Sequence, residues 1–284
     1  MNFKDNLVLV LGGTGLLGYM LMQRAIIQKL NFIGTKRNKM SFEKSKKKYF
    51  LKVNDITNIK LIESIIKKYK PTFIVNCLSL PDRNSNPEKI LDLYSIFPKK
   101  LAILSHKYNF KIINISSDGI FGGDKNIYTE NNIPDPNDIY GKCKFLGEVL
   151  DSNVLNIRTS LIGPSLAKNT LFDRVFISNK IKGYKNYIFN GVTNLELSNI
   201  IIHIINFKKF HFGTIHVSGE KISKYDLIKK IKKQFNLKLK VEKEISNIPI
   251  KRVLKPSKLL KSFNLKINNW DDMILDLKKY NVQK

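Results

Sequence analysis

The chain has 284 residues, of which 43% are hydrophobic and 26% are charged. This length suits one large domain or a domain with a smaller lobe, and the hydrophobic fraction excludes general disorder. Two cysteines, Cys77 and Cys143, are too few for a disulfide framework or a zinc cluster. We therefore expect a protein of the reducing cytoplasm without a metal site.

The charge balance is strongly basic, with 50 Lys and Arg residues against 23 Asp and Glu residues and a net charge of +27. Only six of these cations are arginine, the residue that specific nucleic-acid sites favour, and the lysines are spread over the whole chain. We expect no specific nucleic-acid partner. The longest apolar candidate for a membrane span, residues 200–205, is far shorter than the ~20 residues that a spanning helix needs, so we expect no membrane insertion.

The chain begins with the pattern of a strand, a glycine-rich turn and a helix. Residues 7–11 are a continuous apolar run, which is typical of a strand buried on both faces of a parallel sheet. Residues 12–18 contain four glycines, and residues 19–30 have helical spacing. Strand-like and helical segments then alternate along the chain. The expected strands are residues 31–34, 49–53, 73–78, 111–116 and 154–158, and the expected helices are residues 59–69, 91–108 and 140–150, with a kink or a new start at Pro98.

This alternation predicts an α/β fold with a doubly wound parallel sheet, the Rossmann arrangement. After residue 160 the pattern loosens, with one more strand at residues 214–217 and a basic amphipathic helix at residues 224–235. We expect residues 1–160 to form the Rossmann domain. Residues 161–284 are expected to form mainly a smaller α/β substrate lobe that is partly interwoven with it.

The glycine-rich turn predicts a dinucleotide site, because it lies between a strand and a helix. One glycine allows the tight turn, one lets the backbone approach a pyrophosphate, and one lets the helix pack on the strand. The free N–H groups of the helix N-terminus then bind the phosphates. The alternative is an ordinary strand-to-helix turn. The expected cofactor-binding residues of this turn are Gly12, Thr14, Gly15, Leu16, Leu17 and Gly18.

The end of the second expected strand bears on the choice of cofactor. NAD-selective sites place an acidic residue about 20 residues beyond the glycines, whereas this chain has Thr35, Lys36 and Arg37 there. Two cations at this position suit the 2′-phosphate of NADP(H), which we favour over NAD(H). The alternative is that Lys36 and Arg37 are two ordinary surface cations.

A candidate catalytic set follows in the second half of the expected Rossmann domain. Tyr140 and Lys144 are four residues apart, so a helix places both on one face. An ammonium beside a phenol helps lower the pKa of the phenol, which can then give a proton to a carbonyl oxygen as hydride arrives at the carbon. Ser117 follows a strand at the edge of the sheet where α/β proteins bind ligands, and its hydroxyl can orient the carbonyl. The alternative makes Ser116, Ser117 and Asp118 turn and capping residues.

Taken together, these motifs resemble the dTDP-4-dehydrorhamnose reductase family, a sugar-nucleotide branch of the extended short-chain dehydrogenases. The resembling segments are residues 12–18, 116–123, 128–130, 134–135, 138–148, 158–160, 216–219 and 222–223. The resemblance implies a nicotinamide cofactor and reduction of a 4-keto-6-deoxy sugar nucleotide at C4, for surface polysaccharide synthesis. It also implies that Tyr140 is the proton donor, that Lys144 modulates it and binds the cofactor ribose, and that Ser117 is the carbonyl partner.

The resemblance adds residues to the expected cofactor site. Asp55 and Ile56 resemble the family's pair on the adenine side, and Cys77, Leu78 and Ser79 are expected to line the cofactor. The chain departs from the family at Tyr94, where many members carry asparagine, and it matches the family only loosely at residues 251–254. These departures bear on which sugar is the substrate more than on the type of reaction.

Two alternative functions remain at this point. The first is a reductase or epimerase of another nucleotide sugar. The second is a non-catalytic, nucleotide-binding regulatory subunit, which resembles the partner subunit of methionine adenosyltransferase. The complete set of Ser117, Tyr140 and Lys144 favours an enzyme. The sequence leaves the oligomeric state, including a homodimer, open.

Overall fold

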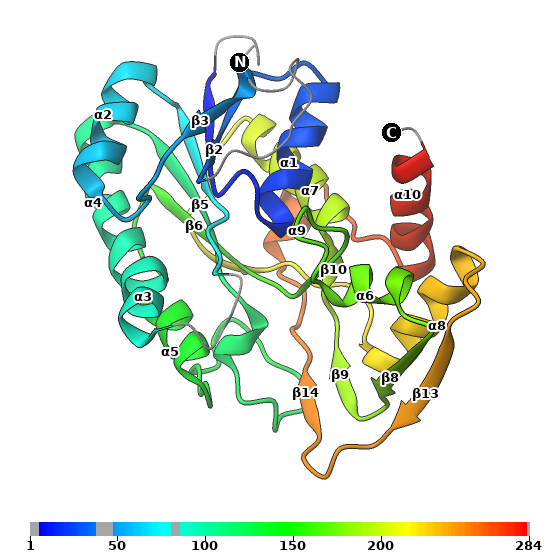
Figure 1. The fold of residues 1–284 in the computed structure, drawn as a ribbon. Helices are drawn as coiled ribbons and strands as arrows, with labels where there is room; N and C mark the ends of the chain where they lie inside the picture. The colour runs from blue at the N-terminus through cyan, green and yellow to red at the C-terminus, as the bar shows by residue number, and fades with distance from the viewer. Residues whose placement is uncertain (1–5, 38–47, 81–85, 283–284) are drawn as a thin grey trace.

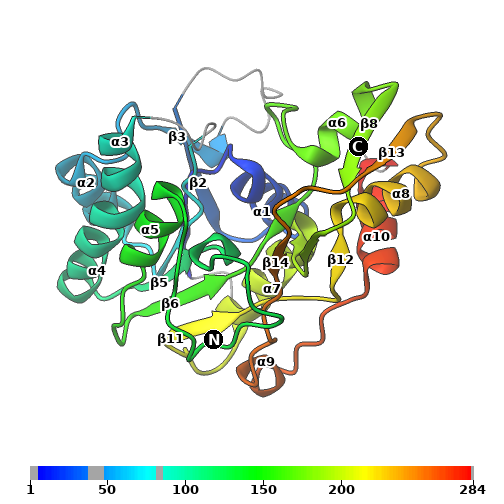
Figure 2. The same cartoon turned by 90° about the horizontal axis from the view of Figure 1, so that it is seen from below.

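The computed structural model describes residues 6–37, 48–80 and 86–282. Figure 1 shows a central sheet with helices on its two faces and, at the lower right, a smaller lobe that contains β8, β9, β13, β14, α6 and α8. In the view from below, α2, α3, α4 and α5 lie on one side of the sheet, and α1 and α7 lie on the other (Figure 2).

The central sheet has seven strands in the order β11-β6-β5-β4-β1-β2-β3, and every neighbouring pair is parallel. The chain builds outward from β1 to β3 and then returns to the other side of β1, so the crevice of a doubly wound sheet lies between β1 and β4. The prediction of such a sheet is confirmed. The strands are β1 (Val8–Leu11), β2 (Phe32–Lys36), β3 (Phe50–Lys52), β4 (Phe73–Asn76), β5 (Lys111–Ile115), β6 (Val154–Arg158) and β11 (Gly213–His216).

The apolar run of β1 is explained by burial on both faces of the sheet. Val8 and Val10 point into one hydrophobic core, and Leu9 and Leu11 point into the other. Successive residues of a strand face opposite sides, so a strand with helices on both sides has no position for a polar residue to meet water. One face is covered by α2 (Ile59–Tyr69), α3 (Pro87–Leu91), α4 (Phe97–Tyr108) and α5 (Ile139–Leu146), and the other by α1 (Leu16–Ile27) and α7 (Asn194–Asn206).

The apolar run at residues 200–205 belongs to α7, which is a core helix. It packs beside α1, and two side chains also join the helices: Arg24 Nε donates to Asn199 Oδ1, and Asn194 Nδ2 donates to the carbonyl of Leu16. Across the part of the chain that the structure describes, no helix combines the length and the apolar character needed to span a bilayer.

The helix expected at residues 91–108 is broken into three parts. A π-helical turn, η2 (Asp92–Ile96), separates α3 from α4. Pro98 explains the break, because a proline has no N–H for the carbonyl four residues earlier and its ring collides with that carbonyl. The carbonyl in question belongs to Tyr94, which lies in the middle of η2. The expectation of a kink or a new start at Pro98 is therefore confirmed: the π turn η2 ends at Ile96, and α4 starts at Phe97.

The smaller lobe is built from short strand pairs that the sequence pattern did not reveal. β8 (Lys180–Tyr184) pairs with β13 (Lys240–Glu244), and β9 (Tyr187–Phe189) lies between β12 (Ile222–Ser223) and β14 (Ile250–Arg252). The chain between these strands returns to the large sheet as β11, so the two parts are interwoven. The division at residue 160 stays a prediction. The remaining elements are β7 (Leu161–Ile162), β10 (Val192–Thr193), α6 (Leu171–Ile177), α8 (Lys224–Gln234), α9 (Leu259–Ser262) and α10 (Trp270–Val282).

Candidate active site

The glycine-rich turn joins β1 to α1 in a very close arrangement. Gly12 has a φ of +76°, a left-handed conformation that favours glycine. A Cβ on Gly18 would lie 2.2 Å from the carbonyl oxygen of Gly12, so the first turn of α1 rests directly on the end of β1. Gly15 is different, because its backbone is extended and a Cβ there would meet nothing nearer than 3.4 Å. Gly12 and Gly18 thus build the turn, whereas Gly15 leaves space beside it.

The N-terminus of α1 differs from most other helix starts in how its backbone N–H groups are satisfied. Within the described residues, α1 has no side-chain cap at Gly15 and no acidic residue in its first turn. Its first N–H groups therefore need another acceptor, and the helix dipole favours a negative one. In the described part of the chain, six other α-helices begin at a side chain that accepts a backbone N–H. These capping residues are Asn58, Asn86, Asp138, Thr170, Thr193 and Ser223.

The end of β2 touches the glycine-rich turn through Thr35. Its hydroxyl accepts the N–H of Gly12 and its carbonyl accepts the N–H of Gly13, both at 2.9 Å. Lys36 and Arg37 follow directly, so the structure places these two predicted site residues beside the turn, with Arg37 exposed. Between β2 and the end of the described segment at residue 37 there is no acidic residue.

The predicted pair Asp55 and Ile56 follows β3 at the same edge of the sheet. Asp55 Oδ1 accepts the N–H of Thr57 at 2.9 Å and its hydroxyl at 2.7 Å. These hydrogen bonds hold the pKa of Asp55 below its ordinary value. Ile56 packs against the core under α2. The carboxylate is therefore fixed and ionised at the side of the crevice.

Cys77, Leu78 and Ser79 follow β4 on the other side of the crevice. The N–H of Cys77 donates to the carbonyl of Leu11, and a Cβ on Gly12 would lie 3.1 Å from the Cys77 carbonyl oxygen and 3.2 Å from Leu78. Burial raises the pKa of the Cys77 thiol to about 12, against the opposing effect of the Lys144 charge. The buried Cys77 thiol is therefore neutral, the Cys77 carbonyl faces the glycine-rich turn, and Ser79 is exposed.

Tyr140 and Ser117 are brought together by two glycines. A Cβ on Gly141 would lie 2.2 Å from the Gly119 carbonyl oxygen, so α5 lies directly against the short helix η3 (Asp118–Ile120). A Cβ on Gly119 would in turn lie 3.1 Å from Ser117 Oγ and 3.3 Å from Tyr140 Cε1. The hydroxyl of Ser117 and the ring of Tyr140 therefore approach each other closely across Gly119, where a side chain would be crowded. Ser117 also caps η3, since its Oγ accepts the N–H of Gly119 at 2.9 Å.

Lys144 is held on the next turn of α5 by two groups from other elements. Its Nζ donates to the carbonyl of Ile115 at 2.9 Å and lies 4.5 Å from the ring centroid of Tyr94. The ring of Tyr94 also meets the ring of Tyr140 edge to face at 5.3 Å. The sequence motifs had not assigned Tyr94 to the site, although Pro98 four residues later signalled the irregular turn that carries it.

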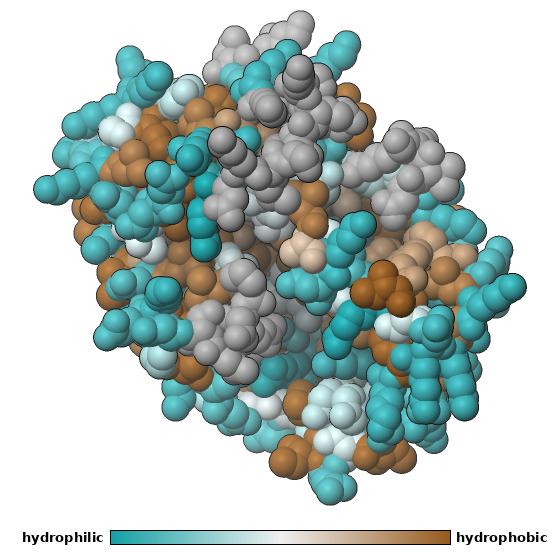
Figure 3. Space-filling model, in the orientation of Figure 1, coloured by the Kyte–Doolittle hydropathy of each residue, from teal (hydrophilic) through white to brown (hydrophobic). Residues whose placement is uncertain are grey.

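A cavity of about 420 Å³ extends from Asp118 into the smaller lobe. Four of its lining side chains are cationic against the single carboxylate of Asp118, and one of these cations, Arg252, has a buried Nε without a hydrogen-bond partner among the described residues. Tyr184 and Tyr187 add a stacked aromatic pair, with ring centroids 4.5 Å apart. The outer edge of this lobe is strongly hydrophilic (Figure 3). The cationic lining residues are Arg174, Lys182, Lys224 and Arg252.

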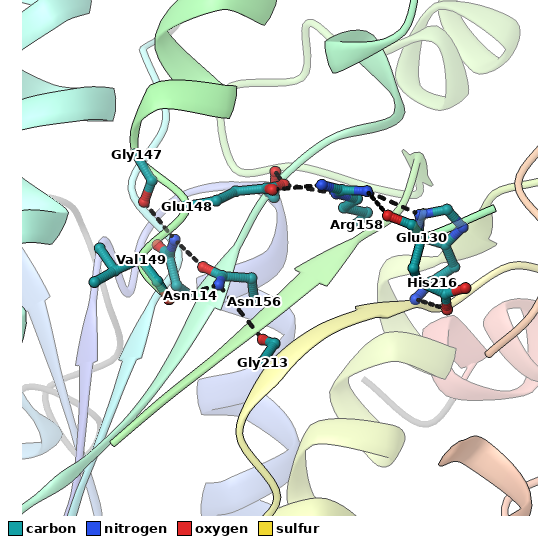
Figure 4. A network of polar contacts seen from close by, with 10 residues as sticks. Asn114, Glu130, Gly147, Glu148, Val149, Asn156, Arg158, Gly213 and His216 are labelled. Atoms are coloured by element: carbon teal, nitrogen blue, oxygen red, sulfur yellow. Dashed lines mark hydrogen bonds and ion pairs between the residues drawn. The ribbon is translucent and has the colours of Figure 1, made fainter. Parts of the chain in front are cut away.

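A second polar group, here called the arginine network, lies where β5, β6 and β11 end. Arg158 forms two hydrogen bonds with Glu148, Nη2 to Oε2 at 2.7 Å and Nε to Oε1 at 2.9 Å, and both side chains are almost fully buried. Figure 4 shows Arg158 between Glu148 and His216. The members of the network are Ser116, Glu130, Glu148, Arg158, His216 and Ser257.

The arginine network fixes the loop that carries Ser117. Ser116 Oγ donates to Glu148 Oε1 at 2.6 Å, which anchors the residue just before Ser117. At the other end, Glu130 accepts the N–H of His216 at 3.3 Å and the hydroxyl of Ser257. The family-like segments at residues 128–130, 158–160 and 216–219 therefore meet in one structural network.

An asparagine ladder crosses three strands beneath this network. Asn76 Nδ2 donates to Asn114 Oδ1, and Asn114 Nδ2 donates to Asn156 Oδ1, both at 2.9 Å. Asn114 and Asn156 also donate to the carbonyls of Gly147 and Val149, which follow α5 (Figure 4). The ladder therefore ties the end of α5 to the sheet. Among the described residues, no group of three or more His, Cys, Asp or Glu side chains is arranged to hold a metal ion.

The chain matches the family model described as the RmlD substrate binding domain over residues 6–281. It belongs to this family. The match covers almost the whole chain, including the smaller lobe.

Individual relatives carry two different names. The rat methionine adenosyltransferase 2 subunit beta is 28% identical over 268 residues, covering 88% of this chain and 78% of that protein. The dTDP-4-dehydrorhamnose reductase of Aggregatibacter actinomycetemcomitans is 26% identical over 194 residues, covering 61% of this chain and 64% of that protein. Among solved structures, the dTDP-4-dehydrorhamnose reductase of Bacillus anthracis in complex with NADP has a TM-score of 0.79 at 22% identity, covering 97% of this chain and 99% of that one.

Proposed function

We propose that this chain is an NADP(H)-dependent reductase of a dTDP-linked 4-keto-6-deoxy sugar, which converts dTDP-4-dehydrorhamnose to dTDP-rhamnose. The observation that carries the proposal is the close approach of the Ser117 hydroxyl and the Tyr140 ring across Gly119. Both residues lie at the carboxyl-end edge of the sheet, which also carries the uncapped N-terminus of α1 and the cavity that begins at Asp118. In this proposal residues 1–160 hold the dinucleotide, and residues 161–284 hold most of the sugar nucleotide.

The residues along the crevice fit a dinucleotide. Gly15 leaves room for a pyrophosphate beside the backbone, and the first N–H groups of α1 are available to bind it. Cys77 and Leu78 form the opposite wall. The fixed carboxylate of Asp55 lies on the side where an adenosine would rest.

The chain's own groups supply the proton and the orientation that a ketone reduction needs. When bound, the dinucleotide supplies a hydride to the ketone carbon. Tyr140 Oη donates a proton to the ketone oxygen, and Ser117 Oγ donates a hydrogen bond that orients it. Lys144, fixed on the carbonyl of Ile115, stabilises the negative charge left on the phenol and binds the ribose next to the nicotinamide.

The cavity in the smaller lobe supports an anionic, nucleotide-linked substrate. Arg252 has a buried Nε that no described residue satisfies, and a phosphate oxygen is an acceptor that suits a guanidinium. Asp118 stands at the inner end of the cavity, where its carboxylate can bind a sugar hydroxyl. The stacked rings of Tyr184 and Tyr187 offer an apolar surface to a base.

The two cations after β2 support NADP(H) over NAD(H). Lys36 and Arg37 lie beside the glycine-rich turn because Thr35 is hydrogen-bonded to it, and a 2′-phosphate needs cations at that place. Changing both residues to glutamate is expected to weaken NADPH binding by about tenfold or more and to leave NADH binding within about threefold. The two dissociation constants are measured by titrating NADPH or NADH with the protein and following the fluorescence of the reduced dinucleotide. Equal losses for the two dinucleotides would exclude a role in recognising the 2′-phosphate.

The relatedness to methionine adenosyltransferase 2 subunit beta supports a second candidate function, a nucleotide-binding regulatory subunit. That function needs the dinucleotide crevice, but it does not need the arrangement of Ser117, Tyr140 and Lys144. A reductase or epimerase of a different nucleotide sugar is the third candidate, since the catalytic geometry does not depend on the base.

The deciding experiment is the loss of NADPH absorbance with purified protein and dTDP-4-dehydrorhamnose, beside the same reaction with NADH. Rapid oxidation with formation of dTDP-rhamnose supports the reductase. Oxidation only with another keto-sugar nucleotide supports the third candidate. No oxidation by a protein that binds NADPH, together with a change in the activity of an added methionine adenosyltransferase catalytic subunit, supports the regulatory function.

A further inference from the structure

Tyr94 occupies an unusual place between the two residues of the proposed Tyr–Lys pair. Its ring lies edge to face with Tyr140, with ring centroids 5.3 Å apart and an angle of 86° between the planes. The ammonium of Lys144 lies 4.5 Å from the centroid of the Tyr94 ring. Tyr94 is almost completely buried. One aromatic side chain therefore contacts both residues.

The backbone around Tyr94 explains how the ring is aimed. Pro98 prevents the ordinary helical hydrogen bond to the Tyr94 carbonyl, and the chain forms the π turn η2 there. The freed carbonyl lies against α5, where a Cβ on Gly147 would come within 1.7 Å of its oxygen. Ser95 Oγ donates to the carbonyl of Cys143 at 2.9 Å, so η2 is fastened to the helix that carries Tyr140 and Lys144.

The hydroxyl of Tyr94 is used at the rim of the crevice. It accepts the N–H of Leu80 at 2.6 Å and lies 3.5 Å from Ser79 Oγ. The hydroxyl is therefore bound to the loop after β4, and this arrangement gives Tyr94 a positioning role. The ring acts on Lys144 and Tyr140, and the hydroxyl acts on the loop that lines the cofactor side.

From this geometry we infer that Tyr94 is a positioning residue that holds the Lys144 ammonium over its ring and seats Tyr140 against its edge. The inference rests on the proposed reductase function for its kinetic consequences, but the contact with Lys144 can be tested without turnover. A cation over an aromatic face in a partly buried site is held by the ring quadrupole, and an aliphatic side chain of similar size has no such field.

The first test separates the ring from the hydroxyl. Tyr94→Phe keeps the ring, whereas Tyr94→Leu and Tyr94→Met fill the space without it. Lysine reactivity is measured by brief acetylation and mass spectrometry, with the labelling of Lys144 expressed relative to the other lysines. We expect Lys144 to be labelled about tenfold faster in Tyr94→Leu and within about twofold of wild type in Tyr94→Phe. Tyr94→Met is included so that one ringless variant remains testable if the other fails to fold.

The matched control is Tyr225→Leu. The ring of Tyr225 on α8 is likewise approached by lysines, with Lys229 Nζ at 5.5 Å and Lys185 Nζ at 5.8 Å from its centroid. This change is expected to leave the labelling of Lys144 and the turnover of the keto sugar as in the wild type. An equal rise in Lys144 labelling in the control would show that the effect comes from general loosening, and it would overturn the inference.

Kinetics give the second readout. In Tyr94→Leu we expect kcat to fall about tenfold or more, and in Tyr94→Phe about threefold or less, because the ring is retained. The NADPH dissociation constant is expected to rise in Tyr94→Phe, since the N–H of Leu80 loses its acceptor. Wild-type labelling of Lys144 in a folded Tyr94→Leu would overturn the inference. If the wild-type protein does not reduce the sugar, the proposed function fails, and the labelling ratio alone decides the role of Tyr94.

Discussion

Two polar regions lie at the same edge of the sheet, and they differ in what their polar atoms meet. In the arginine network, Arg158 and Glu148 bind each other and their neighbours within the protein. At the glycine-rich turn, the first N–H groups of α1 have no side-chain cap among the described residues. Both regions consist of family-like segments. The comparison shows that one set of motifs maintains the architecture, whereas the other leaves room for a ligand.

The largest expected effect is a loss of catalytic activity without a loss of stability. Tyr140→Phe removes only the hydroxyl, and the ring keeps its contact with Tyr94. We expect kcat to fall by about 10²–10⁴-fold, the usual contribution of a general acid, with Tm unchanged. Initial rates of NADPH oxidation and thermal unfolding measure the two quantities. Wild-type rates in this variant would remove Tyr140 from the mechanism.

The opposite result is expected when the arginine network is broken. Arg158→Leu leaves the buried carboxylate of Glu148 without its partner, which costs about 3–5 kcal/mol of the free energy of unfolding. Urea denaturation measures this loss. Glu148→Gln/Arg158→Leu is the matched control, because removing both charges should recover much of the stability. If Arg158→Leu were as stable as the wild type, the arginine network would not stabilise the fold, and the contrast with the glycine-rich turn would be wrong.

Two glycines of the glycine-rich turn are expected to have different roles, one in the stability of the fold and one in dinucleotide binding. Gly18→Ala places a methyl group 2.2 Å from a backbone oxygen, and we expect it to lower the free energy of unfolding by about 1–3 kcal/mol. Gly15→Ala meets nothing nearer than 3.4 Å, so it should fold normally and weaken dinucleotide binding about tenfold. Denaturation and NADPH titration of both variants test this division. Equal effects of the two changes on stability and binding would contradict it.

The smallest expected effect is a pH dependence that originates in the arginine network. Burial lowers the pKa of His216, with Glu130 raising it and Arg158 lowering it further. The unfolded chain therefore binds a proton more readily than the folded chain, and stability falls as the pH is lowered through the ordinary histidine value of 6.5. We expect Tm to decrease by a few degrees over this range, and His216→Gln to reduce the decrease. A steeper decrease in the variant would contradict the assignment.

The elements of the Rossmann half could be predicted from the sequence because the patterns that indicate them are local. The strand at residues 7–11, the glycines after it and the helix Ile59–Tyr69 each depend on neighbouring residues, and the structure places them within a few residues of the expected bounds. The spacing of Tyr140 and Lys144, four residues apart on one helix, is local as well. Their expected helix was too long at its end, since α5 stops at Leu146.

The parts that could not be predicted depend on contacts between distant segments. The strand pairs of the smaller lobe join residues that are far apart in the chain, such as Phe189 with Ile222 and Lys180 with Lys240, and short strands carry little pattern of their own. The asparagine ladder joins three strands through side chains that are normally rare in strands, so propensity argued against it. The contact of Tyr94 with Lys144 needed the π turn, which Pro98 signals but does not orient.

The late position of β11 has a consequence for synthesis of the chain on the ribosome. β6 ends at Arg158, but the strand that covers its outer side begins only at Gly213. Until that strand emerges, the nascent sheet presents the unpaired backbone N–H and carbonyl groups of β6 at an open edge, which is the kind of surface that pairs with other chains. Only the first elements of the smaller lobe, among them α6, β8 and β9, are translated during this interval. Early protection of β6, by a chaperone or by slow elongation, is therefore expected to increase the yield of correctly folded protein.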